Sequence, residues 1–429
     1  MARGMEAERN SGRRRRTFAF LAAAVCALAA VPPAQAGAAT VPSAPGDGAV
    51  SYWTPERMRQ AEAADPPLAT AFPDPGAPVT HAAAGARGPV LTVPPVGGGA
   101  APLPARERGG RASRAYESGE VADPTGVGTR THGRLFFTVP GEGNAACSAT
   151  AIRSNRRSLV LTAGHCVHGG GHQGEWFRNV AFVPAYERGD APFGVWQATR
   201  LYATPIWVEF GDPTGDMAVI ATRPNNRGKL QNVVGARGIG FGRDPAQRYT
   251  ALGYPANPDD GFDGERERYC RSGFAGRDAT GGYGPRTISI ECDMTQGASG
   301  GGWLTETSTI ASLTSYGYPD LEDVIYGPYL GSLARELYEA TQIRCRGEVA
   351  TIVGTAAGDR IAGTKGKDVI VAAAGADTVL ASPKDDVVCG GPGADGIDVG
   401  AGWGELLGGG GDDSLICGSG TDRCSGGDG

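Results

Sequence analysis

The chain has 429 residues, of which 70 are glycine and only 7% are aromatic, so part of its length is not compact core. Its length suffices for two or three domains. The formal net charge of −6 lies in residues 344–429, which contain 13 acidic and 7 basic residues. The chain therefore lacks the basic surface that nucleic-acid binding requires, and we expect no nucleic-acid partner.

The first 36 residues have the organisation of an export signal. Four arginines at 13–16 precede an apolar stretch at 18–31, and Ala34-Gln35-Ala36 provides a small-residue cleavage site. The apolar stretch is too short for a transmembrane helix. We therefore expect a secreted, extracellular protein with no membrane segment after signal removal. The general and twin-arginine export routes both remain open.

Residues 37–125 are rich in alanine, proline and glycine. This composition buries little apolar surface, so we predict a largely disordered propeptide or linker. The exception is the segment 51–58, where a short helix is predicted to begin after Thr54. A basic cluster further along is a candidate processing site; its members are Arg106, Arg108, Arg111 and Arg114.

Residues 126–343 show short apolar runs, such as 134–139, 159–162 and 217–220, separated by glycine, proline, asparagine and aspartate. Short strands at this spacing predict an all-β barrel or sandwich. A helix is predicted at 329–343, where Leu330, Leu333, Leu337 and Tyr338 share one face.

An internal repeat of nine residues occupies 351–424. Its register places an apolar residue two positions after each acidic one, and Gly404 fills the single position without an aspartate. The register aspartates are Asp359, Asp368, Asp377, Asp386, Asp395, Asp413 and Asp422.

Three segments of the middle region carry the groups needed for serine-based amide hydrolysis. Thr162-Ala163-Gly164-His165-Cys166 supplies a base, and Gly297-Ala298-Ser299-Gly300-Gly301 supplies a nucleophile on a glycine-rich turn. There the N–H groups of Gly297 and Ser299 can converge on an oxyanion. Asp216, at the start of an apolar run, supplies the orienting acid, with Asp212 as a nearby alternative.

These motifs, in the order His, Asp, Ser, resemble the chymotrypsin-like serine peptidases over about half of the chain. The bacterial exported V8-like and trypsin-like members are the nearest in pattern. The resemblance implies a double antiparallel β-barrel with a C-terminal helix and an active site between the barrels. It also implies a protein or peptide substrate, an acyl-enzyme mechanism and no cofactor for catalysis. Two disulfides are implied, Cys147–Cys166 and Cys270–Cys292.

The same resemblance suggests which residues bind substrate. Ser315-Tyr316-Gly317 would pair with the substrate backbone, and the Ser315 hydroxyl would also bond Asp216. Asp293 and Thr295 would approach the specificity pocket, where Asp293 would favour arginine or lysine. Ala298 replaces the aspartate with which the digestive enzymes pair a new amino terminus, so removal of an inhibitory 37–125 segment is the expected activation.

The repeat resembles the RTX nonapeptide, which forms a parallel β-roll that binds calcium. Two nonapeptides make one turn, so residues 18 apart stack on one edge. One column then contains Asp359, Asp377, Asp395 and Asp413 without a gap, and the other contains Asp368, Asp386 and Asp422 around Gly404. These aspartates are the predicted Ca²⁺ ligands. The alternative is a flexible acidic tail, and the pairing of Cys345, Cys389, Cys417 and Cys424 stays open.

The sequence thus predicts a secreted, monomeric serine endopeptidase with four parts: a signal at 1–36, a propeptide at 37–125, the peptidase domain at 126–343 and the roll at 344–429. The alternative is a catalytically inactive peptidase-like scaffold that acts as a calcium-dependent surface or matrix binding module. Labelling by a fluorophosphonate distinguishes the two, because only an activated serine reacts.

Overall fold

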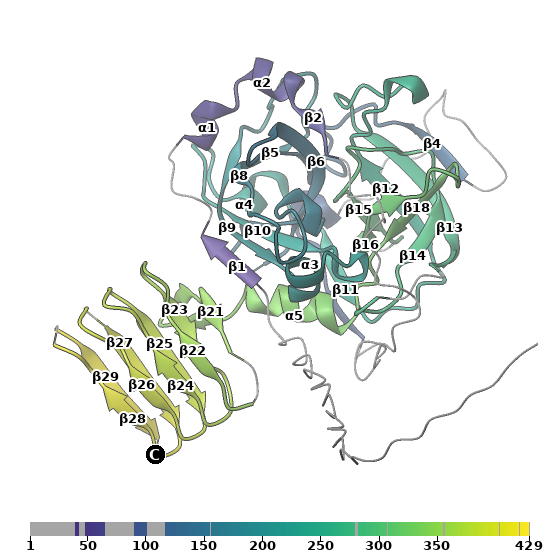
Figure 1. Ribbon diagram of the computed structural model, residues 1–429. Helices are drawn as coiled ribbons and strands as arrows, with labels where there is room; N and C mark the ends of the chain where they lie inside the picture. Colours follow the sequence, from purple (N-terminus) through teal and green to yellow (C-terminus); the bar gives the residue numbers. More distant parts are fainter. Residues whose placement is uncertain are drawn as a thin grey trace, which may run out of the picture. The chain divides into compact units, whose positions relative to one another are not determined.

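The computed structural model describes residues 39–42, 48–64, 90–100 and 116–428, except 155, 279–281, 307, 355–356, 403 and 420 (Figure 1). The predicted export signal and the arginine cluster at 106–114 lie outside the described residues. Within the part that is described, no helix has the length and apolar character to cross a membrane.

Six antiparallel strands form a closed barrel in the first half of the middle region. The pairing order is β9-β10-β7-β6-β5-β8, and the β8–β9 pair closes the ring. Leu135, Val160 and Ile220, on three different strands, are buried in its core. The strands are β5 (His132–Val139), β6 (Gly143–Ile152), β7 (Leu159–Thr162), β8 (Arg178–Pro184), β9 (Trp196–Ala203) and β10 (Ala218–Thr222), and β1 (Ala39–Pro42) pairs with β9.

A second sheet follows in the order β17-β18-β14-β13-β12-β15-β16-β11-β3, with β4 paired to β13. Its pairs are antiparallel except β11–β16, which is parallel. The fold class is thus all-β, as predicted. The strands are β11 (Gly238–Phe241), β12 (Arg248–Gly253), β13 (Arg268–Arg277), β14 (Ile288–Glu291), β15 (Gly302–Leu304), β16 (Thr309–Leu313), β17 (Tyr316–Gly317) and β18 (Val324–Gly327).

Two strands that precede residue 126 belong to this second sheet. β3 (Leu91–Val93) pairs with β11, and β4 (Tyr116–Glu120) pairs with β13 along five residues. Tyr116 and Ser118 are buried there. β4 precedes the predicted boundary at 126, and its backbone hydrogen bonds join it to the second sheet.

Residues 48–64 also fold, as α1 (Ala49–Tyr52), α2 (Pro55–Gln60) and β2 (Glu62–Ala63). The predicted helix after Thr54 is confirmed: the Thr54 hydroxyl accepts the N–H of Arg57, and Pro55 stands at the first helical position. The folded segment includes the predicted exception at 51–58, and Trp53 and Met58 within it are buried against the barrel.

The remaining helices are short. α5 (Ser332–Ala340) ends the middle region and buries Leu337 and Tyr338 on one face, although it is shorter than the predicted 329–343. The others are α3 (Pro205–Phe210) and α4 (Leu230–Val234), with the 3-10 turns η1 (Gly97–Ala100), η2 (Gly164–Cys166), η3 (Pro213–Gly215) and η4 (Pro258–Asp260).

The C-terminal part is a parallel β-roll of two sheets, as predicted (Figure 1). Each strand pairs with the strand 18 residues further on, for example Ile370 with Val388. Apolar side chains from both sheets fill the space between them. One sheet contains β21 (Ile352–Val353), β23 (Val369–Val371), β25 (Val387–Pro392), β27 (Glu405–Gly410) and β29 (Arg423–Asp428); the other contains β22 (Arg360–Ala362), β24 (Thr378–Leu380), β26 (Gly396–Asp398) and β28 (Ser414–Ile416).

A small hairpin and two disulfides belong to this C-terminal part. The hairpin joins β19 (Arg344–Cys345) to β20 (Glu348–Val349). The four cysteines whose pairing the sequence left open form Cys345–Cys389 and Cys417–Cys424. The first of these bonds ties the hairpin to β25, and the second lies within a single repeat.

Candidate active site

His165 sits on the short turn η2, directly after β7. The predicted Cys147–Cys166 disulfide is present and links this turn to β6. Its 19-residue separation corresponds to roughly 3 kcal/mol in the loop-entropy account. The His165 side chain is buried, and the Trp207 ring meets it edge-on at 6.1 Å between centroids. The disulfide and the Trp207 ring therefore hold the histidine in place.

Asp216 orients the imidazole. Its Oδ2 accepts from His165 Nδ1 at 2.7 Å, its Oδ1 accepts the backbone N–H of His165 at 2.8 Å, and the Ser315 hydroxyl also donates to Oδ2. Burial alone would raise the pKa of Asp216, but the ion pair and hydrogen bonds with His165 and Ser315 bring the pKa below its ordinary value. Asp216 is therefore an ionised partner for the imidazole.

Asp212, the alternative acid, has a different role. Its carboxylate accepts the N–H and hydroxyl of Thr214 and the N–H of Tyr283. It therefore caps the turn η3 that leads into Asp216, whereas the described carboxylate bonds of His165 are to Asp216. The geometry favours Asp216 as the triad acid.

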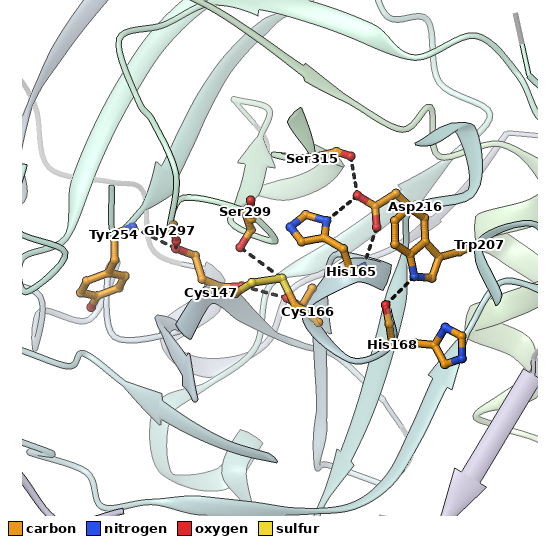
Figure 2. The surroundings of a disulfide bond; sticks show 12 residues. Cys147, His165, Cys166, His168, Trp207, Asp216, Tyr254, Gly297, Ser299 and Ser315 are labelled. Atoms are coloured by element: carbon orange, nitrogen blue, oxygen red, sulfur yellow. Dashed lines mark hydrogen bonds and ion pairs between the residues drawn. A yellow bond between two sulfur atoms is a disulfide. The ribbon is translucent and has the colours of Figure 1, made fainter. Parts of the chain in front are cut away.

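Ser299 lies on the turn before β15, and Figure 2 shows the His165 ring between Ser299 and Asp216. The His165 Nε2 is buried and has no hydrogen-bond partner among the described residues, so it is free to accept the serine proton. Gly297 adopts φ +85°, and a Cβ there would lie 2.5 Å from the Tyr254 carbonyl oxygen. Only glycine fits this turn, which presents the N–H groups at 297 and 299.

Two supporting residues were not found from the sequence. The Ser148 hydroxyl donates to the Gly297 carbonyl at 2.8 Å, and the Ser148 N–H donates to the Ser299 carbonyl at 2.7 Å. Trp207 donates its indole N–H to the His168 carbonyl at 2.9 Å, which fixes the ring beside His165. The signal for Trp207 was the Thr204-Pro205 pair that begins α3.

A cleft of about 830 Å³ opens beside Ser299. Its lining includes every residue predicted to bind substrate: Asp293, Thr295, Ser315, Tyr316 and Gly317. The lining is rich in carboxylates, with Asp259, Asp260, Asp293, Glu322 and Asp323 against the single cation Arg268. The Ser118 hydroxyl donates to Asp293 Oδ2 at 2.6 Å, so β4 positions this acid from behind.

The predicted Cys270–Cys292 disulfide is not formed. Both cysteines are buried free thiols, and their sulfurs lie with an Asp293 carboxylate oxygen within 4.8 Å of one another. The Cys270 thiol instead donates to the Glu291 carbonyl at 3.6 Å. The prediction therefore identified two neighbouring cysteines, but the second sheet is held here by its strand pairing without their bond.

The two aspartate columns of the roll differ in how their carboxylates are satisfied. In both, Oδ1 accepts a backbone N–H from the residue 18 positions earlier, as Asp395 does from Asp377. In the column containing Asp395, the buried Oδ2 atoms of Asp377, Asp395 and Asp413 have no hydrogen-bond partner among the described residues.

In the other column, the Oδ2 of Asp368 accepts from Thr364, and the Oδ2 of Asp386 accepts from Ser382. Burial raises the pKa of Asp395, and the neighbouring carboxylates of Asp377 and Asp413 raise it further. The carboxylate oxygens without a partner thus lie on one edge of the roll, where neighbouring carboxylates repel one another.

Two solved structures are similar to this chain. The protease Anisep from Arthrobacter nicotinovorans is 35% identical over 49% of this chain and 94% of its own, with a TM-score of 0.45. The thermostable serine protease AL20 from an extremophilic microorganism is 35% identical over 50% of this chain and 97% of its own, with a TM-score of 0.46. The chain belongs to the chymotrypsin-like serine proteases. A search of curated proteins gives no match.

The C-terminal part of this serine protease matches a second family. Residues 353–383, 372–402 and 398–429 each match the RTX calcium-binding nonapeptide repeat. The resemblance to the RTX repeat that the sequence indicated is thus confirmed.

Proposed function

We propose that this protein is a secreted serine endopeptidase that cleaves peptide bonds through an acyl-enzyme. The observation that carries the proposal is the His165–Asp216 pair at 2.7 Å, whose free Nε2 faces Ser299. The base, its orienting acid and the nucleophile come from three separate segments, and a buried carboxylate used in this way is typical of the triad.

In acylation, Ser299 Oγ attacks the scissile carbonyl carbon while His165 Nε2 takes the hydroxyl proton. The carbonyl oxygen becomes an oxyanion held by the N–H groups of Gly297 and Ser299, and each such donor contributes roughly 10²–10³ to the rate. The C–N bond then breaks, and the same proton passes from Nε2 to the leaving amine. A water molecule then attacks the acyl-enzyme carbonyl while His165 Nε2 takes its proton. This proton passes to Ser299 Oγ as the acid product leaves.

We further propose that the cleft favours arginine or lysine on the acyl side of the scissile bond. Asp293 lines the cleft and stands six residues before the nucleophile in the sequence. Four further carboxylates also line the cleft. The Ser118 hydroxyl donates to one oxygen of Asp293, and the other oxygen is the proposed partner of the substrate cation. The Ser315 to Gly317 segment, whose last two residues form β17, would hold the substrate backbone.

The tail fits a structural role for Ca²⁺. Buried carboxylate oxygens without a partner are suitable ligands for a hard cation, and glycine-rich turns supply carbonyl oxygens. The residues proposed to hold the ion are Asp359, Asp377, Asp395 and Asp413. We assign a weaker role to Asp368 and Asp386, because hydroxyl groups already satisfy their carboxylates, and to Asp422, whose neighbour in the column is Gly404.

The remaining organisation is proposed from the sequence. Residues 1–36 direct export to the extracellular space, residues 37–125 hold the processing site, and the mature enzyme is a monomer. We place the start of the peptidase domain at β4, from Tyr116 on, because β4 pairs with β13.

A fluorophosphonate probe tests the proposed function. The purified protein should bond the probe at Ser299, found by mass spectrometry of the labelled peptide, and should hydrolyse a peptide library with a preference for arginine or lysine. Ser299→Ala is the matched control and should remain unlabelled. If the unaltered protein is neither labelled nor active, the protein is the inactive binding scaffold instead.

A further inference from the structure

Residues 48–64 pack on an apolar surface, here called the groove, whose buried members are Phe136, Ala146, Ala181, Val183, Tyr186 and Tyr254. Trp53 and Met58 are buried in a cluster with barrel residues Phe136, Tyr186 and Tyr254. The Trp53 ring lies 5.2 Å from the Phe136 ring, measured between centroids. Removing apolar side chains of this size from water stabilises a contact, so these two anchors hold the segment.

Polar contacts fix the segment in one register. The Trp53 indole N–H donates to the Asn179 carbonyl at 2.6 Å, and the Tyr52 hydroxyl donates to the Asn144 side chain at 2.8 Å. The Arg134 guanidinium donates to the Ala61 carbonyl at 3.3 Å. The groove therefore recognises the path of the backbone as well as two apolar side chains.

The segment ends beside the catalytic turn. β2 pairs with β6 at Ala145 and Ala146, and the Ala64 N–H donates to the Ala146 carbonyl at 2.9 Å. Ala63 Cβ lies 3.4 Å from the position that a Cβ on Gly297 would take. Ala146 directly precedes Cys147, whose disulfide leads to the His165 turn. β2 thus covers the edge of β6 next to the oxyanion donors.

The direction of β6 identifies which half of the substrate needs this edge. β6 reaches the catalytic turn at Ser148, which bonds Gly297 and Ser299. In Figure 2, Ser315 and Cys147 lie on opposite sides of Ser299. A substrate with its acyl side along Ser315 to Gly317 therefore extends its leaving-group side past Ser299, from Ser148 back toward Ala145.

β2 runs the other way. It is parallel to β6, so it approaches the catalytic turn where a leaving group would move away from it. A chain in this reversed direction occupies the edge without presenting a peptide bond as a substrate does. The acyl-side cleft stays open, since none of its lining residues comes from 48–64.

We propose that the groove is a peptide-binding site for a segment with tryptophan and methionine five residues apart, and that residues 48–64 fill it as a reversed, built-in inhibitor of the leaving-group side. The inference rests on the proposed peptidase function. It assigns inhibition to one half of the cleft and to one part of the 37–125 segment.

Two substrates assayed on the full chain test the proposal. One is a quenched peptide with residues on both sides of the scissile bond; the other is an ester of one basic residue with a small leaving group. Trp53→Ala/Met58→Ala should raise kcat/KM for the peptide about tenfold, because β2 leaves the edge of β6 in a larger fraction of the molecules. The value for the ester should change less than twofold, and its turnover reports that the barrel is folded.

Three comparisons make the result specific. Ala64→Pro, which removes the donor to Ala146 and leaves the anchors intact, should act in the same direction. Glu56→Gln, on the exposed side of α2, should change neither substrate. A synthetic peptide of residues 48–64 added to the double variant should restore inhibition toward the long substrate, and a peptide with Trp53→Ala should not.

Equal gains for both substrates, or no gain in either anchor or Ala64 variants, would overturn the proposal. If the unaltered chain and every variant neither hydrolyse the ester nor bond the fluorophosphonate at Ser299, the proposed function is wrong. Calorimetry of the 48–64 peptide against the double variant would then still decide whether the groove binds it, and no binding would refute the groove assignment.

Discussion

The protease part and the roll use buried carboxylates in opposite ways. In the protease part, Asp216 is surrounded by donors from His165 and Ser315, which lie far away in the sequence. In the roll, Asp395 lies between carboxylates 18 residues away on either side, and one oxygen has no partner. The first arrangement needs nothing more to be ionised, whereas the second requires a cation.

This difference shows where each function is encoded. The proposed triad depends on the convergence of three remote segments, so its geometry follows from the whole fold. The roll repeats one local unit, so the proposed ligands follow from the period alone. Substitutions should therefore act in an all-or-none way in the protease part and in graded steps along the roll.

The largest expected effect is on the triad. Ser299→Ala should lower kcat on the order of 10⁶-fold, and His165→Ala nearly as much, because triad members act as a unit and their losses do not add. The double variant should be no slower than either single one. Single-turnover rates, with unfolding curves as a control for structure, measure this; separate, additive losses would contradict the shared role.

The next effect concerns specificity. Asp293→Asn keeps the shape of the cleft wall and the contact with Ser118 but removes the charge. It should lower kcat/KM for arginine and lysine substrates roughly 100-fold, since a substrate cation would lose its buried partner. Matched neutral substrates should change little. A uniform loss over all substrates would place Asp293 outside the recognition of charge.

The roll should show a smaller and position-dependent effect. Asp395→Asn should weaken Ca²⁺ binding by the full chain about tenfold, or about 1.4 kcal/mol, because it removes charge from the unbroken column. Asp422→Asn should weaken it less, since its neighbour in the column is Gly404. Calorimetric titration of chelator-treated protein compares the two, and equal losses would refute the difference between the edges.

The smallest effect tests Glu267, a buried carboxyl without a hydrogen-bond donor among the described residues. Both oxygens of Glu267 are buried without a partner among the described residues, and burial raises its pKa well above the ordinary value, opposed only by Arg237. The folded state therefore holds the proton more tightly than the unfolded state. This carboxyl stabilises the fold fully below its unfolded pKa of about 4, and the contribution is lost as pH rises through the raised pKa.

Glu267→Gln should remove this pH dependence. Its melting temperature should exceed that of the unaltered protein by about 3 °C at pH 8 and match it near pH 4. Differential scanning calorimetry at the two pH values checks this. A difference of the same size at both would show that packing, rather than ionisation, separates the two proteins.

The sequence predicted what depends on short motifs and on period. The residues around His165 and Ser299, the Cys147–Cys166 bond and the 18-residue stacking were all visible as patterns. Asp216 was harder to separate from Asp212, because both precede an apolar strand. Only the hydrogen bonds decide between them. The Asp212 carboxylate accepts from Thr214, whereas the Asp216 carboxylate accepts from His165.

Some contacts join segments that lie far apart in the sequence and have the composition of a linker, and these contacts were not predictable. Residues 48–64 lie in a stretch rich in alanine and proline, and their anchors become apolar contacts only when Phe136 and Tyr254 provide the groove. The same holds for β4, whose five residues look like a linker until β13 pairs with them. The free state of Cys270 and Cys292 depends on side-chain positions that spacing does not determine.

The bonds from each aspartate N–H to the carboxylate 18 residues further on make the roll a chain of nearest neighbours. In such a system the order of each turn affects only the next turn. The length of an uninterrupted run therefore sets how cooperatively that run orders. The run through Asp359, Asp377, Asp395 and Asp413 can order as one unit. On the other edge, Gly404 separates Asp386 from Asp422, so ordering cannot pass from one to the other through carboxylates.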